Sequence, residues 1–462
     1  MFLFTSLSSF LSLPDHSFPF ISPIMRQHFL ASLISFWSIM IIGTLGGSDE
    51  WGKNRQDLID TGACLLQLQT NASHQLYEAL RGRRDTRQDE KARACNNGHD
   101  CDDYRIDDRG KKNHRLCTPS TLTIRKEWRF LSKAERRKYI EAVYCLQSKP
   151  SLFTEEEAPG SKNLFDSFAV VHITKTPFIH GNFNFLAWHR YFVWAYEKAL
   201  REECGYHGIS PYWEWGYDVY DPQKSALFDG SPYSFGSNGA PLAERDPTYR
   251  LPPPPPFPKV EGREFPAGTG GGCVMFGPFS DMTTNLGPVG MPGGDLNNPL
   301  RYNPRCLMRD MNPFIGQHYT SFNWSTWTIE ESREIDEFQS RLAGAPGNED
   351  RKDFPLNFFG VHGGGHTFLG GMTGQHSDFY SSPQEPAFFL HHGQIDRLWS
   401  IWQWLDIEKR RNAIYGTLTL ANIPPTRNGT LDDIIDVGPL APPVPVREVM
   451  STIDGPFCYF YQ

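Results

Sequence analysis

The sequence predicts a mainly α-helical protein, with a helical bundle at its core, long loops and little β-structure. A capping box, in which Ser132 precedes Glu135 by three residues, opens a helix that carries Tyr139, Val143 and Leu146 on one face. No run with the alternating pattern of a β-strand reaches a convincing length. With 39% hydrophobic residues in a chain of 462, the protein can bury a large core. These observations indicate one helical domain.

The predicted helices follow one another within a single domain of residues 117–462. Residues 221–311 separate the second helix from the third, show little periodicity and include five consecutive prolines at 252–256. We expect this stretch to be a long loop that wraps around the domain and is pinned by Cys273 and Cys306. The expected helices lie at about residues 132–147, 188–203, 327–342, 359–368 and 391–408.

The first 47 residues have the pattern of an export signal. A short basic stretch begins at Met25, an apolar run follows over residues 29–45, and small residues come next. We expect residues 1–47 to be a leader and signal peptide, with a possible start at Met25, and the protein to be secreted. The apolar run has 17 residues, the short limit of a membrane span, so an uncleaved anchor is the alternative. Three sequons, which agree with a secreted glycoprotein, begin at Asn71, Asn323 and Asn428.

Residues 48–116 form a charged N-terminal extension ahead of the domain. Acidic and basic side chains are mixed over 81–115, and almost nothing in that stretch can pack, so we expect it to be solvated and disordered. The whole chain carries a formal net charge of −8, which argues against a nucleic-acid-binding protein. We expect no membrane contact once the signal is removed.

Nine cysteines without a repeated C-x-x-C pair indicate disulfides rather than a zinc-ribbon array. The first expected pair is Cys117 with Cys145, since the helix between them can fold back. A second bridge is expected among Cys204, Cys273 and Cys306, with Cys458 as a further candidate. Because nine is odd, at least one thiol has no partner within the chain. The weakest candidates for pairing lie in or near the charged stretch: Cys64, Cys95 and Cys101.

Six of the fifteen histidines form two groups whose spacing suits metal binding. His172, His180 and His189 follow one another at intervals of eight and nine residues. His362 and His366 share one helix face, and His392 opens a later helix that can approach them, as in metal sites built inside helix bundles.

The ligand type narrows the choice of metal. Six imidazoles without an obligatory carboxylate or thiolate suit copper, zinc or nickel better than calcium or magnesium. One three-histidine set would indicate catalytic zinc. Two such sets predict a binuclear site with open coordination positions, an arrangement that suits dioxygen bound between two coppers.

Three segments around these histidines resemble signatures of the tyrosinases and catechol oxidases. The first runs from His180 through Trp188-His189-Arg190 to Glu197, and the second from Pro386 through His391-His392 to Asp396-Arg397-Leu398-Trp399. Between them, the segment Pro211-Tyr212-Trp213-Glu214-Trp215 is similar to another landmark of the family. The likeness covers roughly residues 117–461 and is closest to the short secreted fungal members.

The resemblance implies two copper ions per chain and O2 as co-substrate. The implied ligands are His172, His180, His189, His362, His366 and His392, with His391 in a supporting role and no catalytic residue beyond the ligands. We expect Asp396 to accept a hydrogen bond from a histidine ring or to pair with Arg190 or Arg397. Four aromatic residues are expected to shield the site: Phe185, Trp188, Phe388 and Phe389.

The implied activity is that of a copper-dependent polyphenol oxidase, which oxidises small o-diphenols (catechols) to o-quinones. Hydroxylation of monophenols is a further possibility. The alternatives are a tailoring oxidase for one phenolic natural product or peptide, or a haemocyanin-like oxygen-binding protein. A mononuclear zinc hydrolase is more remote, because no H-E-x-x-H motif is present. Because imidazole binds metal only when neutral, we expect activity to fail below roughly pH 5–6.

The chain departs from the family pattern at three positions. Phe178 stands where many members carry a cysteine joined to the following histidine ligand by a thioether, so that cross-link cannot form. Gly363 stands where some tyrosinases have an asparagine that helps to orient a base water, which predicts weak monophenol hydroxylation. Glu385 replaces the usual aspartate but keeps a carboxylate. Tyr459-Phe460-Tyr461 matches the usual close of the core, so we expect no blocking C-terminal lid.

Overall fold

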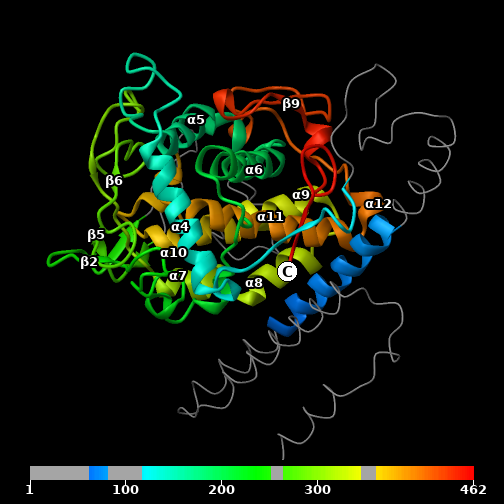
Figure 1. The fold of residues 1–462 in the computed structure, drawn as a ribbon, viewed down its shortest axis with the longest axis horizontal. Helices are drawn as coiled ribbons and strands as arrows, with labels where there is room; N and C mark the ends of the chain where they lie inside the picture. The colour runs from blue at the N-terminus through cyan, green and yellow to red at the C-terminus, as the bar shows by residue number, and fades with distance from the viewer. Residues whose placement is uncertain (1–61, 82–116, 251–263, 345–359) are drawn as a thin grey trace, which may run out of the picture.

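Helices dominate the computed structural model, which describes residues 62–81, 117–250, 264–344 and 360–462 (Figure 1). The mainly α fold predicted from the sequence is confirmed. Among these residues, one helix spans 62–81. The others are α4 (Lys133–Ser148), α5 (Leu164–Ile179), α6 (Phe185–Cys204), α7 (Pro313–Tyr319), α8 (Phe322–Glu330), α9 (Ile335–Ala343), α10 (Gly360–Gly370), α11 (Phe388–Leu405) and α12 (Ile407–Arg410).

The strands in these residues are two to four residues long and form two-stranded pairs. β1 and β10 pair in parallel and so join the beginning of the domain to its end, whereas the other pairs are antiparallel. The pairs are β1 (Thr123–Arg125) with β10 (Tyr459–Tyr461), β2 (Gly239–Pro241) with β5 (Gly271–Val274), β3 (Thr248–Arg250) with β4 (Glu264–Pro266), β6 (Thr283–Thr284) with β7 (Arg305–Cys306), and β8 (Ile434–Ile435) with β9 (Val444–Pro445).

The helices α6 and α11 lie in the middle of the molecule (Figure 1). Every residue of α11 from Phe388 to Trp404 is buried, and most of the first sixteen residues of α6 are buried as well. A helix that is buried all round belongs to the core of a large domain. The metal-binding residues predicted on these helices are therefore held by the most tightly enclosed part of the protein.

Several helix predictions agree with the structure, and two need correction. The capping box of Ser132 and Glu135 opens α4, and Gly205, at φ 63°, ends α6. The helix predicted over 327–342 is two helices, because a second capping box at Glu334 and Glu337 starts α9 after α8 has ended. The helix predicted over 391–408 starts earlier, as α11, and breaks at Asp406 before α12.

The helix α5, which carries His172, was not predicted. It is buried on nearly all sides and contains Pro177 near its end, so its sequence shows no amphipathic stripe and includes a residue that usually interrupts helices. α7 was also missed, because at seven residues it is too short for a periodic pattern.

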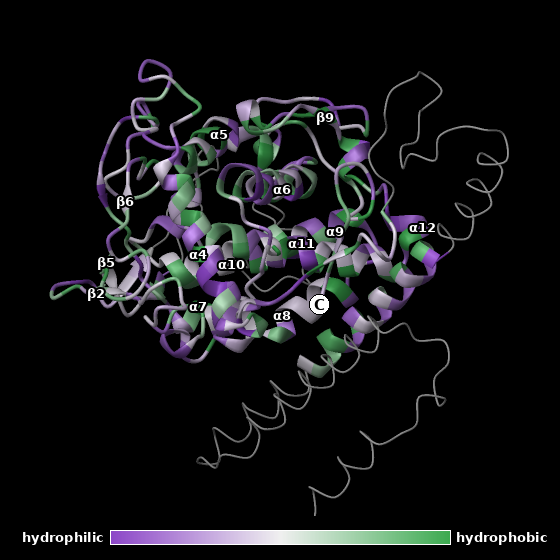
Figure 2. Ribbon diagram, viewed as in Figure 1, coloured by the Kyte–Doolittle hydropathy of each residue, from purple (hydrophilic) through white to green (hydrophobic). Residues whose placement is uncertain are grey.

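The helix at residues 62–81 packs on the domain, whereas the sequence placed the start of the domain at Cys117. Hydrophobic and hydrophilic residues alternate along it (Figure 2), and Leu65, Leu76 and Leu80 are buried in the main core. Gln69 donates to the main-chain oxygen of Tyr461 at 3.2 Å and accepts from Arg397 at 3.1 Å. The helix therefore contacts both the C-terminal strand and α11. The predicted signal peptide and the charged stretch 82–116 lie outside the described residues.

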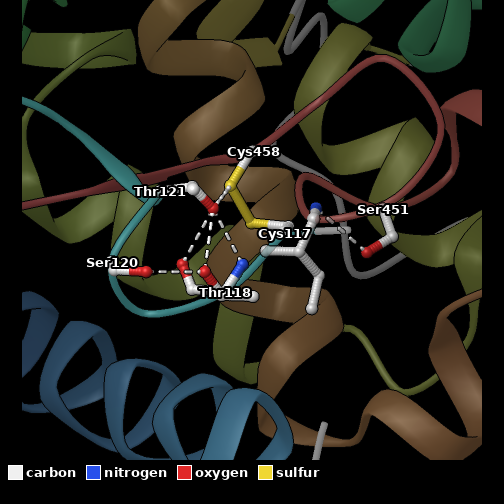
Figure 3. The surroundings of a disulfide bond; sticks show 7 residues. Cys117, Thr118, Ser120, Thr121, Ser451 and Cys458 are labelled. Atoms are coloured by element: carbon white, nitrogen blue, oxygen red, sulfur yellow. Dashed lines mark hydrogen bonds between the residues drawn. A yellow bond between two sulfur atoms is a disulfide. The ribbon is translucent and has the colours of Figure 1, made fainter. Parts of the chain in front are cut away.

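Three disulfides join described cysteines, and they correct the first predicted pair. Cys117 bonds to Cys458 and not to Cys145, which bonds instead to Cys204 across the contact of α4 with α6. Figure 3 shows Cys117–Cys458, with the Thr121 hydroxyl 3.5 Å from the sulfur of Cys458. Cys273 pairs with Cys306 and pins the 221–311 loop as predicted.

Cys117 precedes β1 and Cys458 precedes β10, so the parallel pairing of these two strands brings the two cysteines together. Cys145, half-buried in the last turn of α4, faces Cys204 instead. Among the described helices, none combines the length and apolar character that crossing a membrane requires.

Candidate metal centre

Seven histidines gather in two adjacent groups in the core. In the first group, His172 lies in α5, His180 follows the last residue of α5, and His189 lies in α6. The structure brings together all six histidines predicted from the sequence and adds His391 to the second group. That second group comprises His362 and His366 of α10 with His391 and His392 of α11. Within each group, one ring nitrogen of every histidine lies within 4.8 Å of those of the others.

In the first group, each Nδ1 atom is paired with a main-chain carbonyl. His180 donates to Thr176 at 3.1 Å and His189 to Phe185 at 2.8 Å, each four residues earlier. His172 donates to Tyr380 at 2.6 Å, far away in the sequence. Because a carbonyl oxygen only accepts, each Nδ1 carries the proton and each Nε2 has a free lone pair.

In the second group, the ring nitrogens do not all have hydrogen-bond partners on the main chain. His366 donates from Nδ1 to the carbonyl of His376 at 2.7 Å, and its Nε2 lies 3.1 Å from the Nε2 of His362. His391 and His392 have no hydrogen-bond partner at either ring nitrogen, although both rings are fully buried. Packing orients them instead: the ring of His392 lies 4.3 Å from that of Phe388, and the ring of His391 lies 5.3 Å from that of Trp215.

The two groups touch each other. The rings of His189 and His392 stack with centroids 4.3 Å apart and an interplanar angle of 9°. His180 and His362 face each other at 6.2 Å. Each pair joins one residue of the first group to one of the second, so the two groups form a single centre.

Burial keeps the histidines of this centre neutral. It lowers the pKa of His180 from 6.5 to about 4, and it lowers the pKa values of the other members of both groups well below the ordinary value. Neighbouring imidazoles add to this effect at His172 and His189, because a second positive charge nearby disfavours protonation. Neutral imidazole is the form that binds metal ions.

The unpaired nitrogens fit two metal ions. The Nε2 atoms of His172, His189 and His392 are buried and have no hydrogen-bond partner. A buried polar atom without a partner is costly, and several that face one another call for a shared ligand. Nitrogen donors alone suit copper, whereas calcium and magnesium prefer oxygen. The donor set therefore fits a binuclear copper site with nitrogen donors from both groups.

Aromatic side chains enclose the centre as predicted for Phe185 and Phe388. The ring of Phe185 lies 5.0 Å from His189 and 4.7 Å from His362, and the ring of Phe388 lies 5.3 Å from His172. Trp188 also contacts His189, at 5.0 Å, whereas Phe389 stacks on Tyr196 and belongs to the core behind.

Buried ion pairs fix the helices that carry the ligands. Asp396 of α11 accepts from Arg190 of α6 at 2.5 Å and from the hydroxyls of Tyr459 and Tyr461 at 2.6 Å each. Of the roles predicted for Asp396, the pairing with Arg190 is the one observed. The neighbouring Arg397 pairs with Glu214 at 2.6 Å instead.

Two further features help to hold α10 and α11 in place, a buried ion pair of Glu385 just before α11 and a glycine of α10, Gly365. Arg309 donates to both carboxylate oxygens of Glu385 at 2.8 Å, so the longer side chain that replaces the family's aspartate forms a fully buried, two-bonded pair. A Cβ at Gly365 would lie 2.5 Å from the ring of His391. The glycine thus permits α10 to approach α11.

Sequence reasoning did not identify His376. Its buried ring lies 4.5 Å from that of His366 and 5.1 Å from that of His391. No helical spacing relates it to the other histidines, since it lies in the single turn η5 (Gln375–Ser377) after α10. His391, which the sequence placed in a supporting role, has a ring nitrogen within 4.8 Å of those of the other three histidines of the second group.

Comparisons with known proteins agree with this centre. Residues 162–405 match the model of the common central domain of tyrosinase. The chain is 39% identical to tyrosinase P of Aspergillus terreus over 348 residues, which cover 73% of this chain and 91% of that protein. It is 36% identical to the N-acetyl-6-hydroxytryptophan oxidase ivoB of Emericella nidulans over 359 residues, 75% of this chain and 94% of that one.

A solved structure of a polyphenol oxidase has the same fold as this chain. A mutant polyphenol oxidase from Thermothelomyces thermophila superposes with a TM-score of 0.73 at 36% identity, over 87% of this chain and 98% of that one. The matched region contains both histidine groups and the helices that carry them. The chain therefore belongs to the tyrosinase family of binuclear copper proteins.

Proposed function

We propose that this protein is a secreted polyphenol oxidase that oxidises o-diphenols to o-quinones. The observation that carries the proposal is the pair of touching histidine groups, whose neutral imidazoles leave buried Nε2 atoms without partners. Two copper ions, when bound there, supply the exchange of two electrons between a phenol and O2. In the overall reaction, two catechols and one O2 give two o-quinones and two waters.

The residues of the chain hold, orient and enclose this centre. His172, His180 and His189 would hold one ion, and His362, His366 and His392 the other. The carbonyl bonds at Nδ1 fix the ring planes and the tautomer, as a second set of partners does in other metal sites. The buried rings of Phe185 and Phe388 pack against the histidine rings and shield them from water.

The phenol is expected to approach beside Gly363 and Phe379. Both are half-buried, whereas most of the surrounding histidines are buried. The ring of Phe379 lies 4.6 Å from that of His180, and Gly363 follows His362 directly. A glycine there presents no polar group to the bound phenol, which favours catechol oxidation over monophenol hydroxylation.

The decisive assay measures O2 uptake by the copper-loaded protein with a simple catechol and the matching monophenol, alongside copper per chain. Two coppers and fast uptake with catechol alone support the proposal. Comparable uptake with both substrates identifies a tyrosinase and removes the argument from Gly363. The Gly363→Asn variant tests that argument directly, since it is expected to raise the monophenol rate relative to the catechol rate.

A second candidate is a tailoring oxidase for one phenolic natural product. The similarity to ivoB, named as an N-acetyl-6-hydroxytryptophan oxidase, supports it. Two coppers with slow uptake for simple catechols, but fast uptake with a larger hydroxylated aromatic such as an N-acylated hydroxyindole amino acid, favour this candidate. Reversible O2 binding without turnover of any phenol favours an oxygen-binding protein.

A further inference from the structure

A short segment outside the four helices of the metal centre supplies carbonyl groups to both histidine groups. We call residues 375–380 the orienting segment. His172 of the first group donates to the carbonyl of Tyr380 at 2.6 Å, and His366 of the second donates to that of His376 at 2.7 Å. His180 and His189 instead use carbonyls four residues earlier in their own chain segment. One histidine of each group thus takes its orientation from the same six residues.

His376 and His366 bond to each other reciprocally. The ring of His366 donates to the main chain of His376, and the ring of His376 donates from Nδ1 to the carbonyl of His366 at 3.2 Å. The hydroxyl of Ser377 donates to the same carbonyl at 3.3 Å. Gly370 lets η5 approach α10 this closely, because a Cβ there would lie 2.4 Å from the main-chain nitrogen of Ser377. By this bond, the side chain of His376 holds its own main-chain carbonyl in the position where it accepts from His366.

Two buried side chains anchor the orienting segment, Gln375 at its start and Asp378 in its second half. Asp378 accepts main-chain hydrogen bonds from Val289 at 2.5 Å, from Tyr380 at 2.9 Å and from Ser381 at 3.1 Å. Gln375 accepts from the main chain of Met308 at 2.7 Å and donates to the hydroxyl of Thr284 at 3.2 Å. These bonds tie the segment to the long 221–311 loop, so its carbonyls are held by contacts that do not depend on the histidines.

We propose that the orienting segment fixes the ring orientation of one copper ligand in each group, His172 in the first and His366 in the second. His376 is the positioning residue for His366, and Asp378 anchors the segment and so acts on both groups. The inference rests on the proposed metal centre. It assigns a role to a buried histidine that contributes no nitrogen to either group. It also predicts that the two ions respond differently to changes at His376 and at Asp378.

Three substitutions separate the two nitrogens of His376. In His376→Asn, the amide nitrogen lies near the position of Nδ1 and can still donate to the carbonyl of His366. In His376→Gln, the amide reaches the position of Nε2 instead, and His376→Leu removes both polar atoms at similar volume. Copper per chain and copper loss to a competing chelator are measured for each variant, and thermal unfolding of the metal-free proteins shows whether each one folds.

The expected result is that His376→Asn keeps two coppers, whereas His376→Leu and His376→Gln retain about one and lose the other 10- to 100-fold more readily. The proposal is overturned if Leu and Gln hold both ions as firmly as the unchanged protein. It is also overturned if Gln rescues copper binding and Asn does not, because Nε2 would then be the atom that matters. An unchanged protein that binds no copper contradicts the proposed function instead.

Asp378→Asn provides a second, independent test. The amide keeps only one acceptor oxygen for the main-chain groups, so both ions are expected to dissociate faster. The matched control is Asp295→Asn, since Asp295 also accepts main-chain hydrogen bonds, from Asn297 and Asn298 at 3.1 Å, but in an exposed turn. A selective loss of one ion in Asp378→Asn, or an equal effect in the control, overturns the role of the anchor.

Discussion

The imidazole rings of His189 and His392 stack in parallel, 4.3 Å apart, and so join α6 to α11 at the point where the two histidine groups meet. One residue further along α6, Arg190 donates to Asp396, one turn after His392 on α11. The same pair of helices is thus held by ring packing and by a buried ion pair. These two contacts hold the two histidine groups against each other.

Asp396→Ala is expected to destabilise the protein by about 3–5 kcal/mol, because Arg190 would remain buried and charged without its partner. The change also removes the acceptor of two tyrosine hydroxyls. Denaturant unfolding of the metal-free protein measures the effect. The control is Glu202→Ala, which breaks an exposed pair with Lys198 and is expected to change stability by no more than about 0.5 kcal/mol. Equal effects would contradict the role assigned to Asp396.

The depressed pKa of His180 predicts how the metal-free protein responds to acid. The unfolded chain takes up a proton near pH 6.5, whereas the folded protein does so only near pH 4. Stability is therefore complete above about pH 6.5 and declines as the pH falls towards 4, by about 1.4 kcal/mol per pH unit for each such histidine. Urea unfolding between pH 7 and 4 checks the slope, and a flat profile would contradict burial of neutral imidazoles.

The same shift moves the expected limit of copper binding. Ordinary histidines would release copper as the pH falls below roughly 5–6, whereas protons compete poorly for a ring whose pKa is about 4. Copper is expected to remain bound at pH 5 and to be lost nearer pH 4. Copper content after dialysis at each pH measures this limit, with a return to neutral pH as the test of reversibility.

Leu76→Ala is expected to cost about 2–5 kcal/mol, because it opens a cavity between the 62–81 helix and the core. Leu76 is 2% exposed. Glu78→Ala, on the exposed side of the same helix, is expected to be nearly neutral. Thermal unfolding of both variants distinguishes a packed helix from a dispensable extension, and equal melting temperatures would favour the dispensable extension.

Gly365→Ala is expected to weaken the second metal position, because the new methyl group would press on the ring of His391 and lies 3.1 Å from the indole nitrogen of Trp215. Copper per chain is expected to fall below two. Gly363→Ala, in the same helix at a half-buried position, tests helix propensity alone and is expected to stabilise by up to about 1 kcal/mol. Copper loss in both variants would point to the glycine-rich helix as a whole.

The sequence predicted the helical fold and grouped six histidines that the structure brings together. It succeeded where the signal was local, as at the capping box of Ser132 and the i, i+4 pair of His362 and His366. It failed where the decisive contact is distant in the sequence. The partner of Cys117 depends on strand pairing across the whole domain, and His376 reaches His366 from a single turn without periodicity.

The bond between Cys117 and Cys458 spans 341 positions and turns almost the whole domain into a covalent ring. A ring opened by one cut remains one molecule. A protease that cleaves a single peptide bond anywhere within it should therefore produce no smaller species on a non-reducing gel, while reduction, which opens every disulfide, releases two fragments. In surroundings rich in proteases, one cut would leave both histidine groups attached to the same particle.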